Sequence, residues 1–485
     1  MRVASLTVVG LVVVTPCVTA LPAVPRAYGG DWPQFRGPNG SATTTGKDLP
    51  VEWSADKNIA WKATLPGYGW SSPIIWGDKV FITTAVADKQ KKPSGFGGGF
   101  GGGRGGFGGG GPGGGRGGQR PPDQVYQWQI YCLNAVDGKV IWKQTAAERK
   151  PALGISGFCT YATETPVTDG ERIYAYFGMT GLFCYDFEGK QLWKADLGAY
   201  RMSMGHSTGS SPVLHDGRLF VQYDNEEKSF LVALDAKTGK ELWRVKRTER
   251  TSWSTPVIWK NKMRTEVVCL SNPRARSYDP ATGKQLWELS GLSGQVKATP
   301  AASADLLYLG SGGGFGGFGG RAGPGGGGGR RGPGGGKPLF AVKAGAAGDI
   351  TLKDAAKSND GVAWQLPQAG PSSASPLLYD GRLYVLEERG GIISCLDAKT
   401  GKQIYKERLQ GARGFTSSPW AYDGKIFCLD DSGTTFVVKA GPEFKQLAKN
   451  PIDEMCWSSP AVGSGGVILR SVDHVYCIKQ KTKEK

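Results

Sequence analysis

The chain has 485 residues and a formal net charge of +17 at pH 7, and 76 of its residues are glycine. A length of this order usually corresponds to two or three domains, while the basic surplus favours anionic partners such as acidic proteins, polysaccharides, anionic lipids or nucleic acid. Three histidines in the whole chain argue against a histidine-rich metal site.

The first twenty residues are typical of a secretory signal peptide. A basic start precedes an apolar run over residues 3–14, and a small-residue cleavage site ends at Ala20. We therefore expect residues 1–20 to be removed and the protein to be exported, to the periplasm or the cell exterior. Cys17 follows a proline where lipidation needs a small residue, so no lipid anchor is expected. No later apolar run is long enough to span a membrane.

Ser-Pro and Thr-Pro pairs recur along the chain and open short apolar runs. Most are about 41–46 residues apart, which is the period of a four-stranded propeller blade. Proline is tolerated there because the first residue of a strand need not donate a ladder hydrogen bond. The pairs are Ser72-Pro73, Thr165-Pro166, Ser211-Pro212, Thr255-Pro256, Thr299-Pro300, Ser375-Pro376, Ser418-Pro419 and Ser459-Pro460. They predict eight blades within residues 21–485.

A second motif recurs out of phase with the first. Its clearest copy is Asp235, Gly239-Lys240 and Trp243, in which the aspartate can bond its own turn and the glycine can adopt a positive φ. Further copies end at Trp142, Trp193, Trp287 and Tyr405. Each blade therefore reads as four antiparallel strands, and we expect its last aromatic residue to fill the wedge between neighbouring blades.

Two glycine-rich inserts interrupt the period, at residues 91–122 and 311–337. Neither segment can bury a core, so both are expected to be disordered. They fall between the second and third strands of the first and fifth blades. Two basic arms would then flank one mouth of the central channel, from opposite blades.

The two ends of the chain are expected to share the eighth blade. The last blade has three strands and ends near Ile478, while residues 58–62 carry an orphan Trp61 in the right phase before the first Ser-Pro pair. Pairing them would remove the exposed edge of an open array.

Nine cysteines in an exported protein suggest disulfides, but their placement argues against them. Cys132, Cys184, Cys395 and Cys477 occupy similar third-strand positions in different blades. They should therefore lie far apart as small buried hydrophobes, although one pair between adjacent strands stays an open alternative.

The Ser/Thr-Pro openings and the Asp-x-x-Thr-Gly-Lys-x-Leu-Trp endings resemble the PQQ-like repeat of quinoprotein dehydrogenases. The same repeat builds the propeller lipoprotein of the outer-membrane β-barrel assembly machine. The resemblance covers residues 31–478 outside the inserts, and residues 31–38 look like the mature start of exported bacterial members. It implies an all-β, eight-bladed β-propeller, but not a quinone, because a fold does not carry a function.

A quinoprotein dehydrogenase would need calcium held by carboxylate and amide oxygens, an aspartate base and an arginine beside the quinone. The alcohol-oxidising members also carry two adjacent cysteines, which this chain lacks. No catalytic residue and no metal ligand can be named from the sequence.

Several side chains are nevertheless expected at one mouth of the channel. Trp70, Trp253 and Trp457 each stand three residues before a blade proline, and Glu164, His206, Lys297, Arg413 and Phe415 lie in the corresponding loops of other blades. Aromatic residues with a few charges can form a ligand pocket. The other interpretation, which the repeat spacing favours, is that the three tryptophans are packing residues of the repeat.

These features favour an exported, non-catalytic, monomeric scaffold that binds a protein or an anionic envelope component and needs no cofactor. The alternative function is a PQQ-dependent oxidoreductase of the alcohol or sugar dehydrogenase type, with PQQ and calcium at the same mouth. Nucleic-acid binding through the Arg-Gly inserts is the third and least favoured hypothesis, because the signal peptide directs the chain out of the cell.

Overall fold

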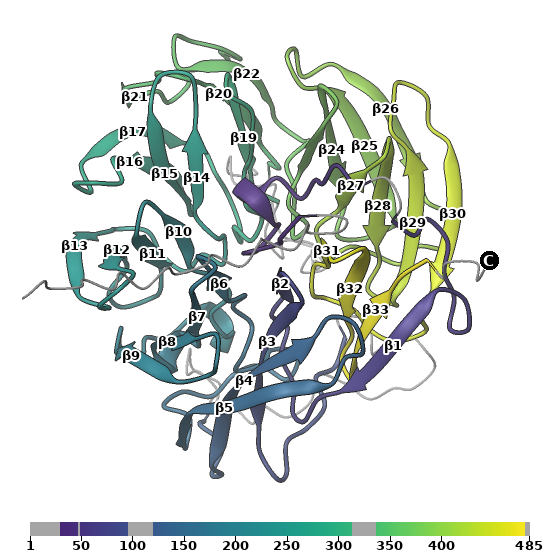
Figure 1. Ribbon diagram of the computed structural model, residues 1–485. Coiled ribbons are helices and arrows are strands. Elements are labelled where there is room, and N and C mark those ends of the chain that lie inside the picture. The colour runs from purple at the N-terminus through teal and green to yellow at the C-terminus, as the bar shows by residue number, and fades with distance from the viewer. Residues whose placement is uncertain (1–29, 47–48, 96–119, 313–335, 481–485) are drawn as a thin grey trace, which may run out of the picture.

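A computed structural model describes residues 30–46, 49–95, 120–312 and 336–480. Within these residues the chain forms eight antiparallel sheets arranged as blades around a central channel (Figure 1). The predicted all-β, eight-bladed propeller is therefore confirmed. The predicted signal peptide, and the inner parts of both glycine-rich inserts, lie outside the described residues.

The first strand of each blade lies at the channel and the fourth at the circumference (Figure 1). Blades 1 and 2 contain β2 (Ile74–Trp76), β3 (Lys79–Val86), β4 (Tyr126–Asn134), β5 (Val140–Arg149), β6 (Val167–Thr168), β7 (Arg172–Tyr176), β8 (Leu182–Asp186) and β9 (Gln191–Ala195). Blades 3 and 4 contain β10 (Val213–His215), β11 (Arg218–Tyr223), β12 (Phe230–Asp235), β13 (Glu241–Lys246), β14 (Val257–Lys260), β15 (Thr265–Leu270), β16 (Arg274–Tyr278) and β17 (Gln285–Ser290).

Blades 5 and 6 contain β18 (Ala301–Ala302), β19 (Leu306–Gly310), β20 (Leu339–Lys343), β22 (Val362–Leu366), β23 (Leu377–Tyr379), β24 (Arg382–Leu386), β25 (Ile392–Asp397) and β26 (Gln403–Arg408). Blades 7 and 8 contain β27 (Trp420–Tyr422), β28 (Lys425–Leu429), β29 (Thr434–Lys439), β30 (Gln446–Pro451), β31 (Ala461–Gly463), β32 (Gly466–Arg470), β33 (His474–Ile478) and β1 (Ile59–Thr64). Short 3-10 turns lie at Pro38–Gly40 (η1), Gly178–Thr180 (η2) and Ser203–Gly205 (η3).

The N-terminal strand closes the propeller. β1 pairs antiparallel with β33, and Lys62 lies opposite Tyr476 in the register. The prediction that residues 58–62 complete the eighth blade is confirmed. With β1 the eighth blade has four paired strands, and β1 covers the β33 edge that would otherwise be exposed.

In most blades the tryptophan of the fourth strand forms a hydrogen bond to the next blade. Trp193 Nε1 donates to the carbonyl oxygen of Ala236 at 3.1 Å, which is the residue after the turn aspartate of the following blade. The same bond joins Trp61 to Ala135, Trp142 to Phe187, Trp243 to Pro280 and Trp364 to Ala398. The expected wedge role is confirmed for these tryptophans.

Trp287 differs from the others. A short strand, β21 (Gly348–Asp349), comes from the long β20–β22 connection of blade 5 and pairs parallel with β17. Trp287 is fully buried and donates to Glu266 Oε2 of its own blade at 2.7 Å. The repeat motif predicts a tryptophan at this position. It does not predict the pairing with β21, because β21 belongs to no repeat.

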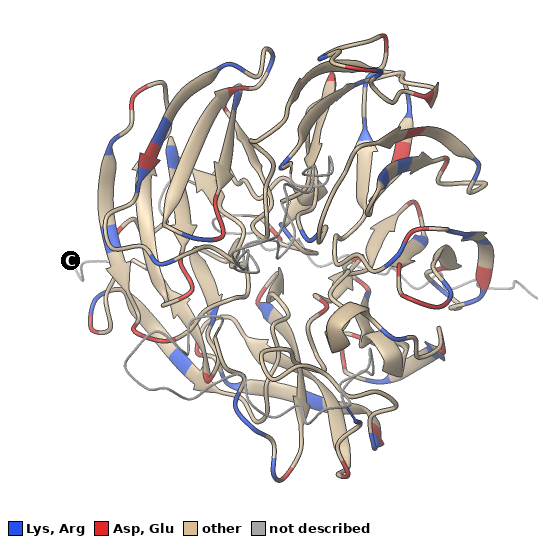
Figure 2. Ribbon diagram, turned by 180° about the vertical axis from the view of Figure 1, so that it is seen from behind, with Lys and Arg blue, Asp and Glu red and all other residues tan. Residues whose placement is uncertain are grey.

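The eight cysteines among the described residues are free thiols. Cys132, Cys184, Cys395 and Cys477 lie on β4, β8, β25 and β33, which are third strands of their blades as expected. Figure 2 shows the positions of basic and acidic residues interspersed around the propeller rather than gathered on one blade. None of the described helices has the length and apolar character needed to cross a membrane.

Residues 31–44, here called the plug segment, cross the channel (Figure 1). Trp32 exchanges two backbone hydrogen bonds with Ile75 of blade 1, and Ala42 accepts one from Ala421 of blade 7. Between them Arg36 is 1% exposed and donates to three backbone carbonyl oxygens of blades 5 and 6. The plug segment thus ties distant blades together inside the channel.

Candidate functional site: a cup at the mouth of the channel

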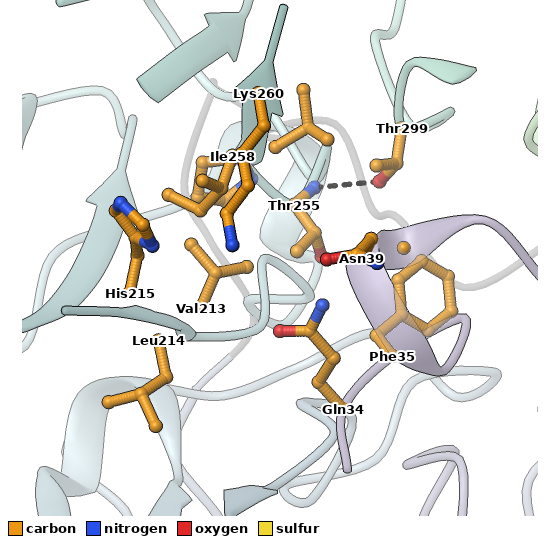
Figure 3. Close-up of a pocket in the computed structure, with 13 residues that line it drawn as sticks. Gln34, Phe35, Asn39, Val213, Leu214, His215, Thr255, Ile258, Lys260 and Thr299 are labelled. Carbon is orange, nitrogen blue, oxygen red and sulfur yellow. Dashed lines mark hydrogen bonds between the residues drawn. The ribbon is translucent and has the colours of Figure 1, made fainter. Parts of the chain in front are cut away.

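The residues before the blade prolines form a ring of hydrogen bonds around the channel. Thr165 N–H donates to Ser211 Oγ of the next blade at 2.9 Å, and Thr255 N–H donates to Thr299 Oγ1 at 3.2 Å (Figure 3). Seven such bonds are present between 2.9 and 3.2 Å. The hydroxyl ring is Ser72, Thr165, Ser211, Thr255, Thr299, Ser375, Ser418 and Ser459.

This ring explains the residue choice in the repeat. A strand-opening residue at the channel has an N–H that points toward its neighbouring blade and needs an acceptor there. Serine and threonine supply a side-chain oxygen at that point, and proline follows because its own position needs no donor. The motif therefore has two roles: it starts each inner strand, and its hydroxyl accepts a hydrogen bond from the neighbouring blade.

A cavity of about 200 Å³ opens above the hydroxyl ring, and we call it the cup. Its floor is the hydroxyl ring together with Phe35 of the plug segment. Its wall includes Trp70, Phe158, His206, Trp253, Lys297 and Trp457.

Backbone hydrogen bonds fix the tryptophans of the wall. Trp70 Nε1 donates to the Phe158 carbonyl at 2.9 Å, and Trp253 Nε1 donates to the Ser207 carbonyl at 2.8 Å. Trp70 and Trp457 pack with ring centroids 5.1 Å apart. The indole groups thus have defined orientations, which is what a preorganised binding wall requires.

The charged groups of the wall favour a neutral imidazole. Burial, and then the charge of Lys297, lower the pKa of His206 to about 4. Lys297 Nζ lies 3.2 Å from Glu388 Oε1, and Ser373 Oγ donates to the same oxygen at 2.9 Å. Burial raises the pKa of Glu388, but Lys297 and Ser373 outweigh it and hold that pKa below its ordinary value.

The structure brings together five of the residues that the sequence places at the mouth: Trp70, His206, Trp253, Lys297 and Trp457 all line the cup. Glu164 lies one layer behind, fully buried against the Thr208 hydroxyl, and burial raises its pKa to about 7.

The other two expected residues contribute differently. Arg413 uses its backbone N–H to bond Asp430 Oδ2 at 3.1 Å and is not among the residues that line the cup. Phe415 is fully buried in the hydrophobic core.

Sequence reasoning missed Phe158, Phe35 and the hydroxyl ring as parts of the site. Phe158 lies in a connection between blades whose length varies, so no repeat position marks it. Phe35 belongs to the plug segment, outside the repeat. The Ser/Thr-Pro motif contains the residues of the hydroxyl ring. It was interpreted only as the start of each strand, so its place in the site was not predicted.

A second, smaller cavity of about 50 Å³ lies beside the plug segment (Figure 3). Gln34, Asn39, His215 and Lys260 are among the residues that line it. At one probe sphere of roughly 10–15 Å³ per water, it has room for a few water molecules, so it is a weaker candidate than the cup.

Comparisons with known proteins identify the family and the fold. The sequence model of the family described as "Outer membrane protein assembly factor BamB" matches residues 127–314 and 346–441. A polyvinylalcohol dehydrogenase from a Pseudomonas species is 28% identical over 138 residues, which are 25% of this chain and 20% of that protein. The match thus spans about a fifth of the length of this curated relative.

Two solved structures share the fold. BamB from Moraxella catarrhalis superposes with a TM-score of 0.50 at 11% identity, covering 74% of this chain and 94% of that one. Quinohemoprotein alcohol dehydrogenase ADHIIG from Pseudomonas putida HK5 gives 0.52 at 12% identity, covering 94% of this chain and 81% of that one. At these identities the similarity shows the fold alone.

Proposed function

Because the chain belongs to the PQQ-like propeller family described as outer membrane protein assembly factor BamB, we propose that it is an exported, non-catalytic scaffold of the cell envelope. It binds a protein partner, or an anionic envelope component, at the cup. The signal peptide expected over residues 1–20 supports the location, and the name of the family supports a role in assembly.

The observation that carries this proposal is the cup itself. Tryptophans dominate the energetic centres of protein interfaces, and here Trp70, Trp253 and Trp457 from three blades converge on one cavity. Their indole N–H groups, in Trp70 and Trp253, are held by backbone oxygens. The parts of these rings that line the cavity can contact an incoming apolar group, while the polar floor can orient it.

The residues around the cup do not fit a calcium-bound quinone. Glu164 bonds Thr208, Glu388 pairs with Lys297, and Asp431 accepts the Thr416 N–H, so these carboxyl groups are already engaged at separate places. The described residues contain no cluster of three or more His, Cys, Asp or Glu side chains that could hold a metal ion. A cavity of about 200 Å³ is also below the roughly 300–1,000 Å³ of small-molecule pockets.

The proposal is tested by partner capture from the native envelope with immobilised full-length protein. Wild type should retain a crosslinked partner that Trp253→Ala and Lys297→Gln lose. Leu242→Ala, at an exposed position on β13, is the matched control and should capture as wild type does. Equal capture by all four proteins, each with an unchanged melting temperature, would refute the proposal.

The second candidate function is a PQQ-dependent oxidoreductase, which the match to polyvinylalcohol dehydrogenase favours. Purified protein is mixed with PQQ and calcium, and quinone absorbance and dye reduction with alcohols or sugars are recorded. The scaffold proposal predicts neither signal. Saturable binding that Trp253→Ala abolishes, together with dye reduction, would replace the scaffold by the enzyme.

A further inference from the structure

The floor of the cup consists of hydroxyl groups whose protons have no acceptor in the described part of the protein. Seven of the eight hydroxyls in the ring accept an N–H from the neighbouring blade. A hydroxyl also carries one donor proton, and none of the eight donates it to another described residue. All are buried, with relative exposures between 1% and 7%.

Unused donors of this kind favour an acceptor inside the cup. A buried donor proton without an acceptor is destabilising, and the repeat places such groups on every side of one axis. Several donors that line one cavity suit a group with several lone pairs. An oxyanion supplies more acceptor sites than a carbonyl or a hydroxyl oxygen, since a carboxylate has about four lone-pair sites.

The charge beneath the floor also favours an anion. Arg36 donates to the carbonyl oxygens of Thr299 and Pro300 at 3.3 Å and of Pro376 at 2.6 Å. Thr299 also contributes a hydroxyl to the ring, so the guanidinium lies close to the floor. Among the described residues the partners of Arg36 are backbone carbonyl oxygens, and no carboxylate pairs with it. A buried cation with neutral partners makes the local potential positive.

The wall adds a second cation and an apolar surface. Lys297 contributes an ammonium group that Glu388 partly balances, and His206 is neutral at pH 7. Glu164 stands behind Thr208 rather than in the cup. Above the polar floor, the aromatic rings of Trp253, Trp457 and Phe158 line the opening.

We propose that the cup binds a carboxylate next to an apolar group, with the carboxylate oxygens on the hydroxyl ring and the apolar group against the tryptophans. This inference rests on the proposed function and names the chemistry that the partner presents. A cavity of about 200 Å³ has room for one residue, either the C-terminal residue of a partner chain or an acidic side chain.

Calorimetry with full-length protein tests this with short peptides. Acetyl-Gly-Gly-Phe with a free carboxylate should bind, and the same peptide with a C-terminal amide should bind at least about tenfold more weakly, which corresponds to 1.4 kcal/mol. Acetyl-Gly-Glu-Phe-amide tests the acidic side chain as the source. Binding by either acid supports the proposal, and the stronger one identifies the source.

Variants of one ring position test the hydroxyl, and their melting temperatures are measured alongside because Thr255 Oγ1 also accepts the Ser211 N–H of the neighbouring blade. Thr255→Val keeps the shape and removes the hydroxyl, whereas Thr255→Ser keeps the hydroxyl, as in the serine positions of the ring. Only the valine variant should lose affinity, by about tenfold. Thr435→Val removes a fully buried hydroxyl on β29 that does not line the cup, and it should bind as wild type does.

Three results would overturn the inference. They are equal binding of the acid and amide forms of acetyl-Gly-Gly-Phe with no tighter binding of the glutamate peptide, equal affinity of the valine and serine variants, and no saturable binding of either acid up to about 1 mM, a level equivalent to −4.1 kcal/mol. Inorganic phosphate that displaces the peptide more strongly than acetate does would also exclude a carboxylate site. If these results occur while Trp253→Ala still loses its envelope partner, this inference fails and the scaffold proposal stands.

Discussion

The indole of Trp193 lies directly on Gly239 of the next blade. A Cβ atom added to Gly239 would be 2.5 Å from Trp193 Cε3, and the glycine has φ +72°. The same relationship joins Trp61 to Gly138, Trp142 to Gly189, Trp243 to Gly283 and Trp364 to Gly401. The glycine of the repeat is therefore required twice, for its turn conformation and for the neighbouring indole.

This relationship predicts unequal effects of two glycine substitutions in blade 3. Gly217 has φ +67° but nothing within 4 Å of its added Cβ, so Gly217→Ala should cost only the conformational strain, about 1–2 kcal/mol. Gly239→Ala should cost about 1–3 kcal/mol more because the indole must move. Denaturant unfolding measures both, and equal losses would show that the contact is unimportant.

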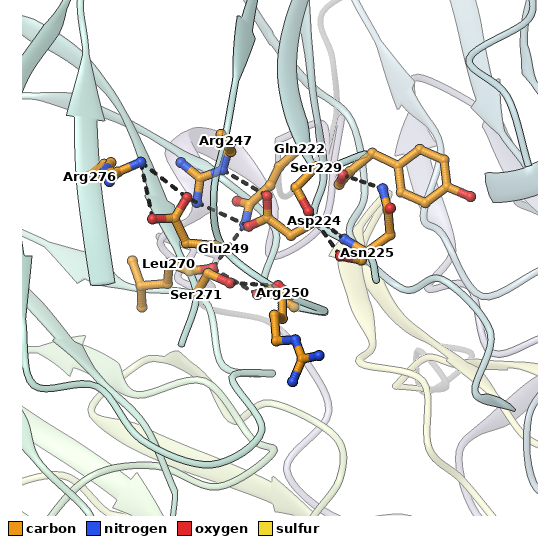
Figure 4. A network of polar contacts seen from close by, with 12 residues as sticks. Gln222, Asp224, Asn225, Ser229, Arg247, Glu249, Arg250, Leu270, Ser271 and Arg276 are labelled. Atoms are coloured by element: carbon orange, nitrogen blue, oxygen red, sulfur yellow. Dashed lines mark hydrogen bonds and ion pairs between the residues drawn. The ribbon is translucent and has the colours of Figure 1, made fainter. Parts of the chain in front are cut away.

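A buried ion network joins blades 3 and 4 (Figure 4). Arg247 and Asp224 are both fully buried, and Arg247 Nε donates to Asp224 Oδ1 at 2.7 Å while a second nitrogen donates to Oδ2 at 3.0 Å. Asp224→Asn should destabilise the fold by about 3–5 kcal/mol, since it leaves a buried charge without its main partner.

The matched control for this network is the exposed pair Arg218–Asp216 of the same blade. Asp216→Asn should cost about 0–1 kcal/mol. Unfolding free energies of the two variants at low and high salt provide the measurement. A loss below 1 kcal/mol for Asp224→Asn would contradict the structural importance of the network.

Glu164 makes stability depend on pH. Burial raises the pKa of Glu164 to about 7 in the folded protein, above the value of about 4.3 in an unfolded chain. The folded state then binds the proton more tightly, so this group stabilises the fold below pH 4 and loses that contribution as pH rises to 7.

Glu164→Gln should remove this dependence. The difference in unfolding free energy between wild type and variant should change by an amount on the order of 3 kcal/mol between pH 4 and 8, in favour of the variant at high pH. Denaturant titrations across this range provide the check. Parallel pH profiles would show that Glu164 ionises as freely in the folded state as in the unfolded one.

Closure of the propeller predicts that Trp61 and Trp364 are equivalent. Both are buried, both donate to the carbonyl of the residue directly after the third strand of the next blade, and both lie on a glycine of that blade. Trp61→Ala and Trp364→Ala should therefore each cost about 3–5 kcal/mol. Denaturant unfolding measures both losses of unfolding free energy. If the loss for Trp61→Ala is less than a third of the loss for Trp364→Ala, the junction formed by β1 is weaker than an ordinary blade interface.

The sequence predicted the blades because the two repeat motifs report local requirements. Pro212 opens a strand without a donor, and Gly239 permits a turn and an indole contact. Trp287 shows where this reasoning ends, because its environment depends on β21 from an irregular connection. A contact made by a segment outside the repeat cannot be predicted from the residue at the repeat position.

The site was predictable in part for the same reason. Trp70, Trp253 and Trp457 share one repeat position, so their convergence on the cup follows from the symmetry of the fold. Phe35 reaches the floor from the plug segment, and Arg36 finds its acceptors in blades 5 and 6. These contacts depend on how the plug segment crosses the channel, which the repeat cannot specify.

The central claim is that the cup binds a partner in the envelope. The most direct measurement is photocrosslinking in living cells from two positions of the full-length protein: Thr163, which lines the cup, and Leu242, which is exposed on β13. We predict a discrete crosslinked partner from Thr163 that Trp253→Ala removes, and no such product from Leu242. The same crosslinks from both positions, or a Thr163 crosslink that persists in Trp253→Ala, would contradict the account.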